Sequence, residues 1–507
     1  MLRLFITLSC LLLLMACSDT EQTGKQTSDQ NPKQGSLGTK STGCKQCHQV
    51  EIDPNHSFSC TTCHQGNISA SDQAAAHVDL ITQPGHPSVM ARTCGSCHPD
   101  QVSGVSHSLH FTLNNSVNLV RQAYGATEKI TDLTAIPVNE PPESVLDLAD
   151  DMLRRRCLRC HLYTPGDDYP ATSRATGCGS CHLQYSGGRM KSHIFQAIPA
   201  NQQCLQCHYG NRVGFDYLGR YEQDLNNEYR TPYTTREEYI RPYGIEYHQL
   251  TADIHQQRGM ICIDCHQGSG LMNTTTPKTP SCSSCHSSQL LTKHLPPQVA
   301  EVNGTFTLYS RGDGRGHIMP IMHNPAHTTY GQTVDCQVCH AQWAYNDRGT
   351  HLLRSDTDNY SDFLYLTVQG SSRVEQILDN NLDFEAEEIE PEMADTITNE
   401  LRPGIWHRGF TTRRWEDPIL GRDTTGKIRV MRPILDLHLS WITDEDEVLF
   451  DSVPATAPNN GLLPYTPHTT GPAGMFYKQR INSFLAREKA SAASRKENKV
   501  KGQTDQP

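Results

Sequence analysis

Cys44-Lys45-Gln46-Cys47-His48 is the first of nine segments in this chain that follow the pattern Cys-x-x-Cys-His. The copies use 18 of the 20 cysteines in 507 residues. From 20 cysteines and 25 histidines placed at random, a chain of this length would contain about 0.04 copies. The repetition therefore reflects a chemical requirement. The cysteines of the nine copies are Cys44, Cys47, Cys60, Cys63, Cys94, Cys97, Cys157, Cys160, Cys178, Cys181, Cys204, Cys207, Cys262, Cys265, Cys282, Cys285, Cys336 and Cys339.

This spacing is the one that covalent haem attachment needs. Two thiols separated by two residues can add to the two vinyl groups on one haem edge, and the next residue then lies under the ring as an iron ligand. The pattern therefore predicts nine haems of c type. The expected proximal iron ligands are His48, His64, His98, His161, His182, His208, His266, His286 and His340.

Zinc and disulfides are the alternatives for these cysteines. Cys-x-x-Cys pairs also build tetrahedral zinc sites, but those sites do not require a histidine at the same position after every pair. A disulfide framework is disfavoured because Cys10 and Cys17, the two remaining cysteines, both lie in an N-terminal targeting segment. Haem is therefore the favoured interpretation.

The second axial ligand of each iron has to come from elsewhere. Sixteen histidines remain, more than a bis-histidine iron at every motif requires. Those close to a motif are expected to bind the adjacent haem rather than their own, and surface or core packing is the expected role of His407, His438 and His468. The first candidates for distal ligands are His86, His193, His255, His323 and His327, followed by His56, His77, His107, His110, His248, His294, His317 and His351.

The N-terminus is typical of an exported lipoprotein. Residues 1–17 form a signal peptide whose apolar run, Leu4 to Met15, is too short to cross a bilayer comfortably. It ends in Leu14-Met15-Ala16-Cys17, which resembles a bacterial lipobox with Cys17 as the lipidated residue; ordinary cleavage near Ala16 is the alternative. Ser18 after the cysteine favours the outer membrane. Residues 18–41 are polar and are expected to be a disordered tether.

The composition indicates a fold that depends on its cofactors. Only 36% of the residues are hydrophobic, so we expect haems to replace side-chain packing in residues 42–340, leaving short helices and loops with little regular structure. The motifs fall into three groups of three. Ser144 is expected to cap a helix that carries Val145, Leu148, Met152 and Leu153 on one face and leads into Cys157. The tyrosines of the insertion 209–261 are expected to pack against haem edges; a redox role is the alternative.

The sequence after the last motif has a different pattern. Residues 341–474 are expected to form a haem-free β-rich region with strands at 427–431, 434–441 and 448–450. The acidic stretch 379–400 is interpreted as a solvated loop, with a basic partner or a divalent cation as the alternatives. Residues 475–507 are expected to form a helix that docks through Phe476, Ile481, Phe484 and Leu485, followed by a basic disordered tail.

One short repeat links the two parts of the chain. Pro325-Ala326-His327-Thr328-Thr329 is echoed by Thr466-Pro467-His468-Thr469-Thr470. The echo is either a coincidence in a Pro- and Thr-rich loop or the remnant of a segment that lost its haem. In the second case His468 is free or serves as a distal ligand for another haem.

The nine motifs and the lipobox resemble the outer-membrane multihaem c-type cytochromes of respiratory and extracellular electron transfer. The resemblance covers residues 44–340 and implies stacked, mostly bis-histidine haems. It also implies partners such as other cytochromes or a porin-type conduit, and a lipid anchor on the periplasmic or cell-surface face. The formal charge of −11 argues against nucleic acid as a partner.

Two other classes are weighed against the electron carrier. One is a multihaem reductase of the nitrite or tetrathionate type, in which one haem keeps an open face. No Cys-x-x-Cys-Lys variant supports it. The other is a conducting filament, which a lipid anchor disfavours.

Overall fold

The computed structural model of the chain describes residues 43–209, 213–222, 247–273, 281–358, 371–381, 383, 385–409 and 412–504. The predicted signal peptide, Cys17 and the predicted tether lie outside the described residues, as do the tyrosines between residues 223 and 246. All 25 histidines lie within the described part.

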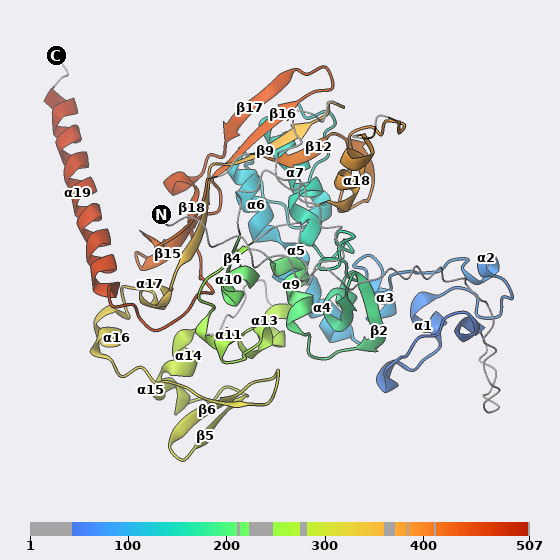
Figure 1. Ribbon diagram of the computed structural model, residues 1–507, viewed down its shortest axis with the longest axis horizontal. Helices are drawn as coiled ribbons and strands as arrows, with labels where there is room; N and C mark the ends of the chain where they lie inside the picture. Colours follow the sequence, from blue (N-terminus) through green and yellow to red (C-terminus); the bar gives the residue numbers. More distant parts are fainter. Residues whose placement is uncertain are drawn as a thin grey trace, which may run out of the picture.

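Short helices and loops make up most of the segment that carries the motifs (Figure 1). Seven motifs each form a short helix of their own or end a slightly longer one. The third motif, Cys94 to His98, forms a turn directly after α3 (Met90–Thr93). The motif helices are η1 (Gly43–Gln46), α1 (Cys60–His64), α8 (Cys178–His182), α9 (Asn201–His208), α12 (Cys262–Cys265), α14 (Cys282–His286) and α17 (Cys336–His340). The fourth motif forms the 3-10 turn η4 (Cys157–Cys160).

The remaining helices connect the motifs or cap the sheets. They are η2 (Pro54–His56), α2 (Gln73–Ala76), α4 (Pro99–Ser106), α5 (Leu109–Thr112), α6 (Asn114–Ala123), η3 (Leu133–Ala135), α7 (Val145–Arg155), α10 (Gly214–Leu218), α11 (Ile254–Gln257), α13 (Gly268–Met272), α15 (Ser288–Leu291), α16 (Pro325–Tyr330), α18 (Ser372–Asn381), η7 (Pro458–Gly461) and α19 (Tyr477–Thr504).

Strands are concentrated after the last motif. A four-stranded sheet has the order β12-β9-β16-β17, in which β16 pairs with β9 in parallel and the other pairs are antiparallel. The strands of this part are β8 (Ala344–Arg348), β9 (Thr350–Ser355), β10 (Glu392–Ala394), β11 (Leu401–Pro403), β12 (Ile405–Arg408), β13 (Thr412–Glu416), β14 (Ile419–Arg422), β15 (Ile428–Pro433), β16 (Leu437–Ile442), β17 (Val448–Pro454) and β18 (Leu462–Pro464). The strands predicted from the sequence correspond to β15, β16 and β17.

Three small sheets lie within the motif-bearing segment, which is therefore less irregular than expected. They pair β1 with β2, β3 with β4, and β5 with β6 and β7. Their strands are β1 (Leu183–Ser186), β2 (Arg189–Phe195), β3 (Arg220–Glu222), β4 (Tyr247–Gln249), β5 (Val299–Val302), β6 (Thr305–Tyr309) and β7 (Gly316–Ile318).

Helix α7 is the element predicted from Ser144. The Ser144 side chain accepts a hydrogen bond from the backbone N–H of Asp147, and the Asp147 carboxylate accepts one from the backbone N–H of Ser144, which is a capping box. Leu148 and Met152 are fully buried on the inner face. They pack with residues of β9, β12 and β16 in the largest apolar core, so the β-rich part encloses the helix that leads into the fourth motif.

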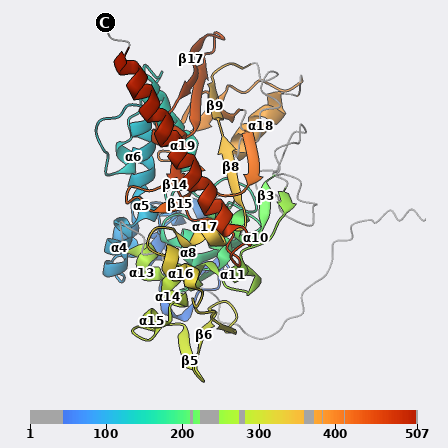
Figure 2. The same cartoon turned by 90° about the vertical axis from the view of Figure 1, so that its left-hand side faces the viewer.

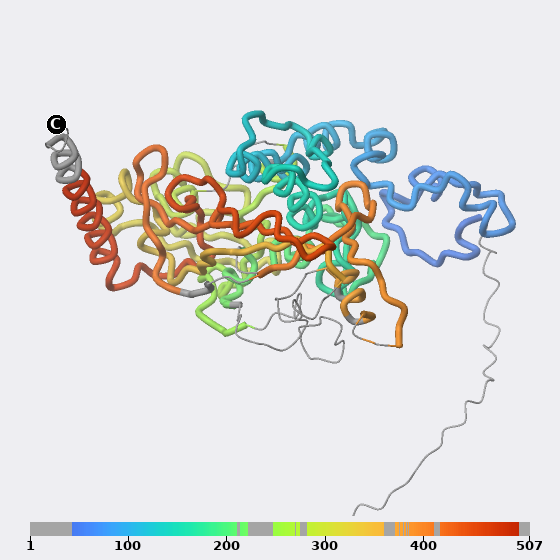
Figure 3. The backbone as a smooth tube through the Cα atoms, turned by 90° about the horizontal axis from the view of Figure 1, so that it is seen from above, coloured from blue at the N-terminus to red at the C-terminus, as the bar shows by residue number. Residues whose placement is uncertain are grey.

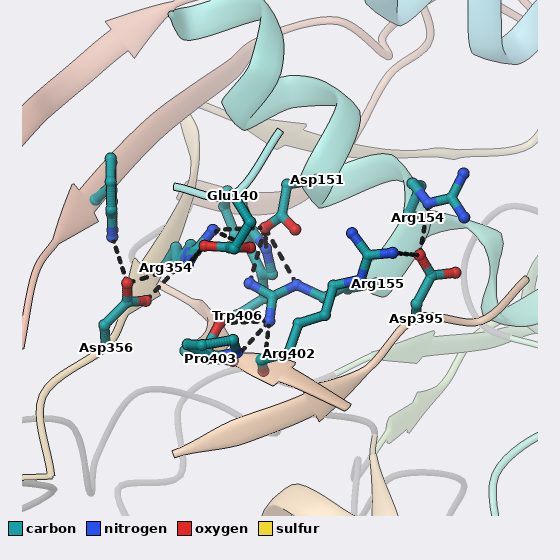
Figure 4. A network of polar contacts seen from close by, with 12 residues as sticks. Glu140, Asp151, Arg154, Arg155, Arg354, Asp356, Asp395, Arg402, Pro403 and Trp406 are labelled. Atoms are coloured by element: carbon teal, nitrogen blue, oxygen red, sulfur yellow. Dashed lines mark hydrogen bonds and ion pairs between the residues drawn. The ribbon is translucent and has the colours of Figure 1, made fainter. Parts of the chain in front are cut away.

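Buried ion pairs and hydrogen bonds fasten α7 to β11 and to the residue that follows β10 (Figure 4). Arg155 donates hydrogen bonds to Asp151 and to the backbone carbonyls of Arg402, Pro403 and Gly404. Arg154 pairs with Asp395, so one member of the acidic stretch is a buried ion-pair partner. Because buried guanidinium groups are tolerated only when their hydrogen bonds are satisfied, this network fixes the position of α7.

The C-terminal helix differs from its prediction in two ways. Ile481 and Phe484 are buried against Val338 of α17, but Phe476 is 69% exposed and does not dock. The helix continues to Thr504, although we expected a disordered tail. The Ala-, Lys-, Arg- and Glu-rich sequence explains the difference, because these residues have high helix propensity. Figure 2 shows α19 crossing the molecule and extending beyond it.

The motif-bearing helices follow one another along the long axis of the molecule. In Figure 1, α1 lies at one end, α9 near the middle, and α14, α16 and α17 toward the other end. The tube in Figure 3 gives the same order from a second direction.

Candidate functional site

A continuous cavity of about 3630 Å³ follows this row of helices. All 18 cysteines of the nine motifs line it, as do the motif histidines with the exception of His161. This volume is several times the roughly 300 to 1,000 Å³ of an ordinary small-molecule pocket, so the cavity has room for several large groups. The motif cysteines place reactive thiols along its whole length.

Histidines face one another across the cavity in seven pairs. One member of each pair belongs to a motif, and the two ring centroids are 5.9 to 6.3 Å apart. The pairs are His48 with His77, His98 with His56, His64 with His193, His208 with His110, His286 with His255, His266 with His468, and His340 with His327.

This separation fits one metal ion between two imidazoles. A bond from a metal to a histidine nitrogen is about 2 Å long, so two such bonds on opposite sides of an ion hold the ring centres about 6 Å apart. Among the described residues, no group of three or more His, Cys, Asp or Glu side chains is arranged to hold a metal ion. Two opposed imidazoles are the ligand set of a haem iron, whereas structural zinc takes four ligands.

Backbone carbonyls orient four of the motif histidines. Nδ1 lies 2.8 Å from the Ile81 carbonyl in His64, 2.7 Å from that of Gln196 in His182, 2.8 Å from that of Pro320 in His286 and 2.9 Å from that of Gly471 in His340. A carbonyl only accepts, so Nδ1–H is the donor and Nε2 keeps its lone pair. This tautomer is the one that binds a metal through Nε2.

Aspartates orient two of the facing histidines. Nδ1 of His255 lies 2.8 Å from the Asp253 carboxylate, and Nδ1 of His56 lies 2.9 Å from that of Asp53. Burial, the largest single influence, opposes ionisation of Asp253. The hydrogen bond and charge interaction with His255, together with the backbone N–H groups of His255 and Thr470, outweigh it and lower the pKa of the carboxyl. A charged carboxylate at Nδ1 makes Nε2 a stronger ligand.

The facing histidines agree only partly with the sequence prediction. His193, His255 and His327 face motif histidines, whereas His86 and His323 do not among the ring contacts of the described residues. Nδ1 of His86 is instead 2.8 Å from the Ser88 hydroxyl. Three facing histidines come from the second group of candidates, His56, His77 and His110. His317 also lines the cavity, but no ring contact of the described residues pairs it with a motif histidine.

Two outcomes differ from the expectations. His468, expected to be a packing residue, faces His266. His327 faces His340 of the motif that it precedes, although we expected such a histidine to reach only a neighbouring haem. Helix α16, which begins at Pro325, places His327 so that its ring lies only 7° from parallel to that of His340.

His161 of the fourth motif makes different hydrogen bonds from the other motif histidines. Its backbone N–H donates to the Leu158 carbonyl, three residues earlier in the chain. In an α-helical turn it would instead donate to the carbonyl of Cys157, four residues earlier. Its Nε2 lies 2.6 Å from the Phe111 carbonyl, and its Nδ1 accepts from the backbone N–H of Tyr163 at 3.3 Å. Burial lowers the pKa of His161 to about 4, so the ring is neutral at pH 7. Both ring nitrogens are therefore occupied by backbone groups, and His161 differs from the expected proximal ligand.

Contacts between cysteines of different motifs give the order of the motifs in space. Hydrogen-bonding contacts join Cys94 with Cys178, Cys160 with Cys207, Cys204 with Cys262, and Cys282 with Cys336. Electrostatic contacts join Cys63 with Cys94, Cys181 with Cys204, and Cys265 with Cys285. His48 and His64 link the first two motifs. The motifs thus form one row in the order 1-2-3-5-6-7-8-9, with the fourth beside the sixth.

Comparisons of the chain with protein-family models, curated proteins and solved structures found no match. A search of the helices within the described residues identified none that is both long and apolar enough to be a candidate membrane span.

Proposed function

We propose that this protein is a nonahaem c-type cytochrome that carries electrons along its row of motifs, anchored at the outer membrane through lipid on Cys17. The observation that carries the proposal is the set of seven histidine pairs across one cavity lined by 18 cysteines. Bound haem c supplies reversible one-electron redox chemistry.

Each part of the chain has a defined task in this proposal. The cysteine pairs attach the cofactor through thioether bonds, and the paired histidines hold the iron from both sides. The carbonyl acceptors of His64, His286 and His340 keep Nε2 available. Hydrogen-bonding contacts join cysteines of motifs 3 and 5, 4 and 6, 6 and 7, and 8 and 9, so cofactors attached at those motifs would lie close together. Electrons would enter or leave through partners of the kind that the resemblance implies, other cytochromes or a porin-type conduit.

A second candidate function is a multihaem reductase of the nitrite or tetrathionate type. One observation favours it. Neither His161 nor His182 faces a second histidine among the ring contacts of the described residues. A site without a second imidazole leaves room for a substrate.

Counting covalent haems tests the proposal. Mass spectrometry of the mature protein after acid-acetone extraction should give nine haems, and Cys285→Ala should weaken or abolish attachment at one motif. Cys10→Ala is the control, because this residue lies in the signal segment and should leave the count unchanged. Low-temperature EPR of the oxidised protein should contain low-spin ferric signals from the seven pairs. A count of seven or fewer, or bound zinc, would refute the proposal.

A further inference from the structure

The seventh motif is the only one with an acidic residue between its two cysteines. That residue, Asp264, lies between Cys262 and Cys265 in the motif helix α12. It is 6% exposed, although aspartate is almost never fully buried unless it is paired. The chain therefore holds a buried acidic side chain next to an expected haem attachment point.

Four neutral donors surround the carboxylate of Asp264. Oδ1 accepts from the backbone N–H of Arg311 at 2.8 Å, and Oδ2 accepts from the backbone N–H of Ile261 at 2.8 Å. The Ser310 hydroxyl donates at 3.0 Å and the Gln298 side-chain amide at 3.4 Å. A backbone N–H can only donate, so both oxygens act as acceptors. This is the hydrogen-bonding state of an ionised carboxylate.

Within the described part of the chain, no cation forms an ion pair with Asp264. Arg311 supplies one of the N–H groups, but its side chain is exposed, and so is that of Arg258, which precedes the motif. The negative charge of Asp264 therefore keeps most of its field, because no ion-pair partner offsets it and burial limits screening by water.

The facing histidines of the seventh motif do not distinguish it from the other paired motifs. His266 faces His468 with the ring centroids 6.3 Å apart, which is within the range of the seven pairs. Asp253 is a second buried carboxylate in this region, but it is hydrogen-bonded to His255, which faces a histidine of the eighth motif. The charge that belongs to the seventh motif itself is that of Asp264.

We propose that the buried charge of Asp264 lowers the reduction potential of the seventh haem and places a low-potential step in the row, between the sixth motif and the eighth. The inference rests on the proposed function, since it requires haem at Cys262 and Cys265. Ferric iron carries one more positive charge than ferrous iron, so a nearby negative charge stabilises the ferric form. The effect is strong where the charge is shielded from water.

Spectroelectrochemical titration of the full-length, haem-loaded protein tests the inference. Asp264→Ser removes the charge and introduces the residue found at the same position of the third, fifth and eighth motifs. One component from the low-potential end of the titration should move upward. A change of about tenfold in its ferric-to-ferrous preference corresponds to about 59 mV. Asp264→Asn, a second neutral variant, should give the same shift, whereas Asp264→Glu keeps the charge and should leave the component close to its wild-type potential.

A nearby exposed carboxylate supplies the matched control. Asp313 is partly exposed and pairs with Arg315, so Asp313→Asn should leave every component in place. The shift in Asp264→Ser should persist from about 0.05 M to about 1 M salt, because salt screens buried charges only weakly.

The outcomes separate a charge effect from a packing effect. An unchanged titration or a downward shift in the neutral variants would overturn the inference. An equal upward shift in Asp264→Glu would also overturn it, because altered packing would then be the cause. Absence of covalent haem from the wild-type protein would instead refute the proposed function.

Discussion

His468 lies against His266 with the two ring centroids 6.3 Å apart and the ring planes inclined by 26°. The loop that carries His468 is held by buried hydrogen bonds. Thr469 donates to the Trp343 carbonyl at 2.7 Å, and the backbone N–H of Thr470 donates to Asp253 at 2.7 Å. A histidine from the last part of the chain is thus brought to the seventh motif, which favours the interpretation of the Thr466–Thr470 echo as a recruited ligand.

Replacement of His468 tests this assignment. His468→Met should raise the potential of one haem, because Met/His ligation stabilises the ferrous state relative to bis-histidine ligation. Spectroelectrochemistry should resolve one component that shifts upward. His438→Met is the control, since His438 stacks on His351 in the four-stranded sheet and should leave every component in place. An unchanged titration of the His468 variant would remove this residue from the ligand set.

Asp253 should set the potential of the haem between His255 and His286. Asp253→Asn removes the negative charge from Nδ1 of His255 and makes its Nε2 a weaker ligand for ferric iron. One component of the redox titration should therefore move upward. If the ligands' affinity for ferric relative to ferrous iron falls tenfold, the potential of this one-electron couple rises by about 59 mV. Asp313→Asn, at a partly exposed pair with Arg315, is the control. A downward shift would contradict the assigned role of Asp253.

Cys17 should decide whether the protein is held in the membrane. If Cys17 carries lipid, Cys17→Ser should move the protein from the membrane fraction to the soluble fraction without changing its haem content. The change should be nearly complete, because two acyl chains anchor stably where one is marginal. Immunoblotting of the two fractions measures it. Retention in the membrane would indicate a protein partner or the basic C-terminal helix as the anchor.

The buried pair of Arg154 and Asp395 should be essential for stability. Asp395→Asn leaves the Arg154 guanidinium, which is only 3% exposed, without its charged partner. Removing one member of a buried pair costs about 3 to 5 kcal/mol. Glu488→Gln, at the exposed pair with Arg422, should cost less than about 1 kcal/mol. Urea unfolding followed by circular dichroism compares the two variants. Equal midpoints would show that the buried network does not hold α7.

The parts of the fold that could be predicted are those that depend on residues close together in the sequence. The expected cap at Ser144 and the apolar face that follows it predict α7, and alternating apolar residues predict β15, β16 and β17, because both signals arise from neighbouring residues. The motif spacing predicts the attachment sites for the same reason. These predictions needed no knowledge of how distant segments meet.

The facing histidines depend on contacts between distant segments. His77 and His110 carry no local mark, whereas nearness to a motif favoured His86, whose ring lies against Tyr163. A local signal was present at His56 and His255. Asp53 lies three residues before His56 and Asp253 lies two residues before His255, and each aspartate fixes the ring of its histidine. The engagement of His161 could not be foreseen, since it depends on the distant Phe111 carbonyl.

The core around α7 has a consequence for how the protein is made. Leu148, Met152, Trp406 and Leu439 pack at the centre of a core whose buried residues include no motif cysteine or histidine, so this core requires no cofactor to assemble. If the proposed haem attachment is right, protein made without haem should keep this core while its motif segments lack their cofactors. Limited proteolysis of such haem-free protein should then leave a resistant fragment that contains α7 and the strands packed around it.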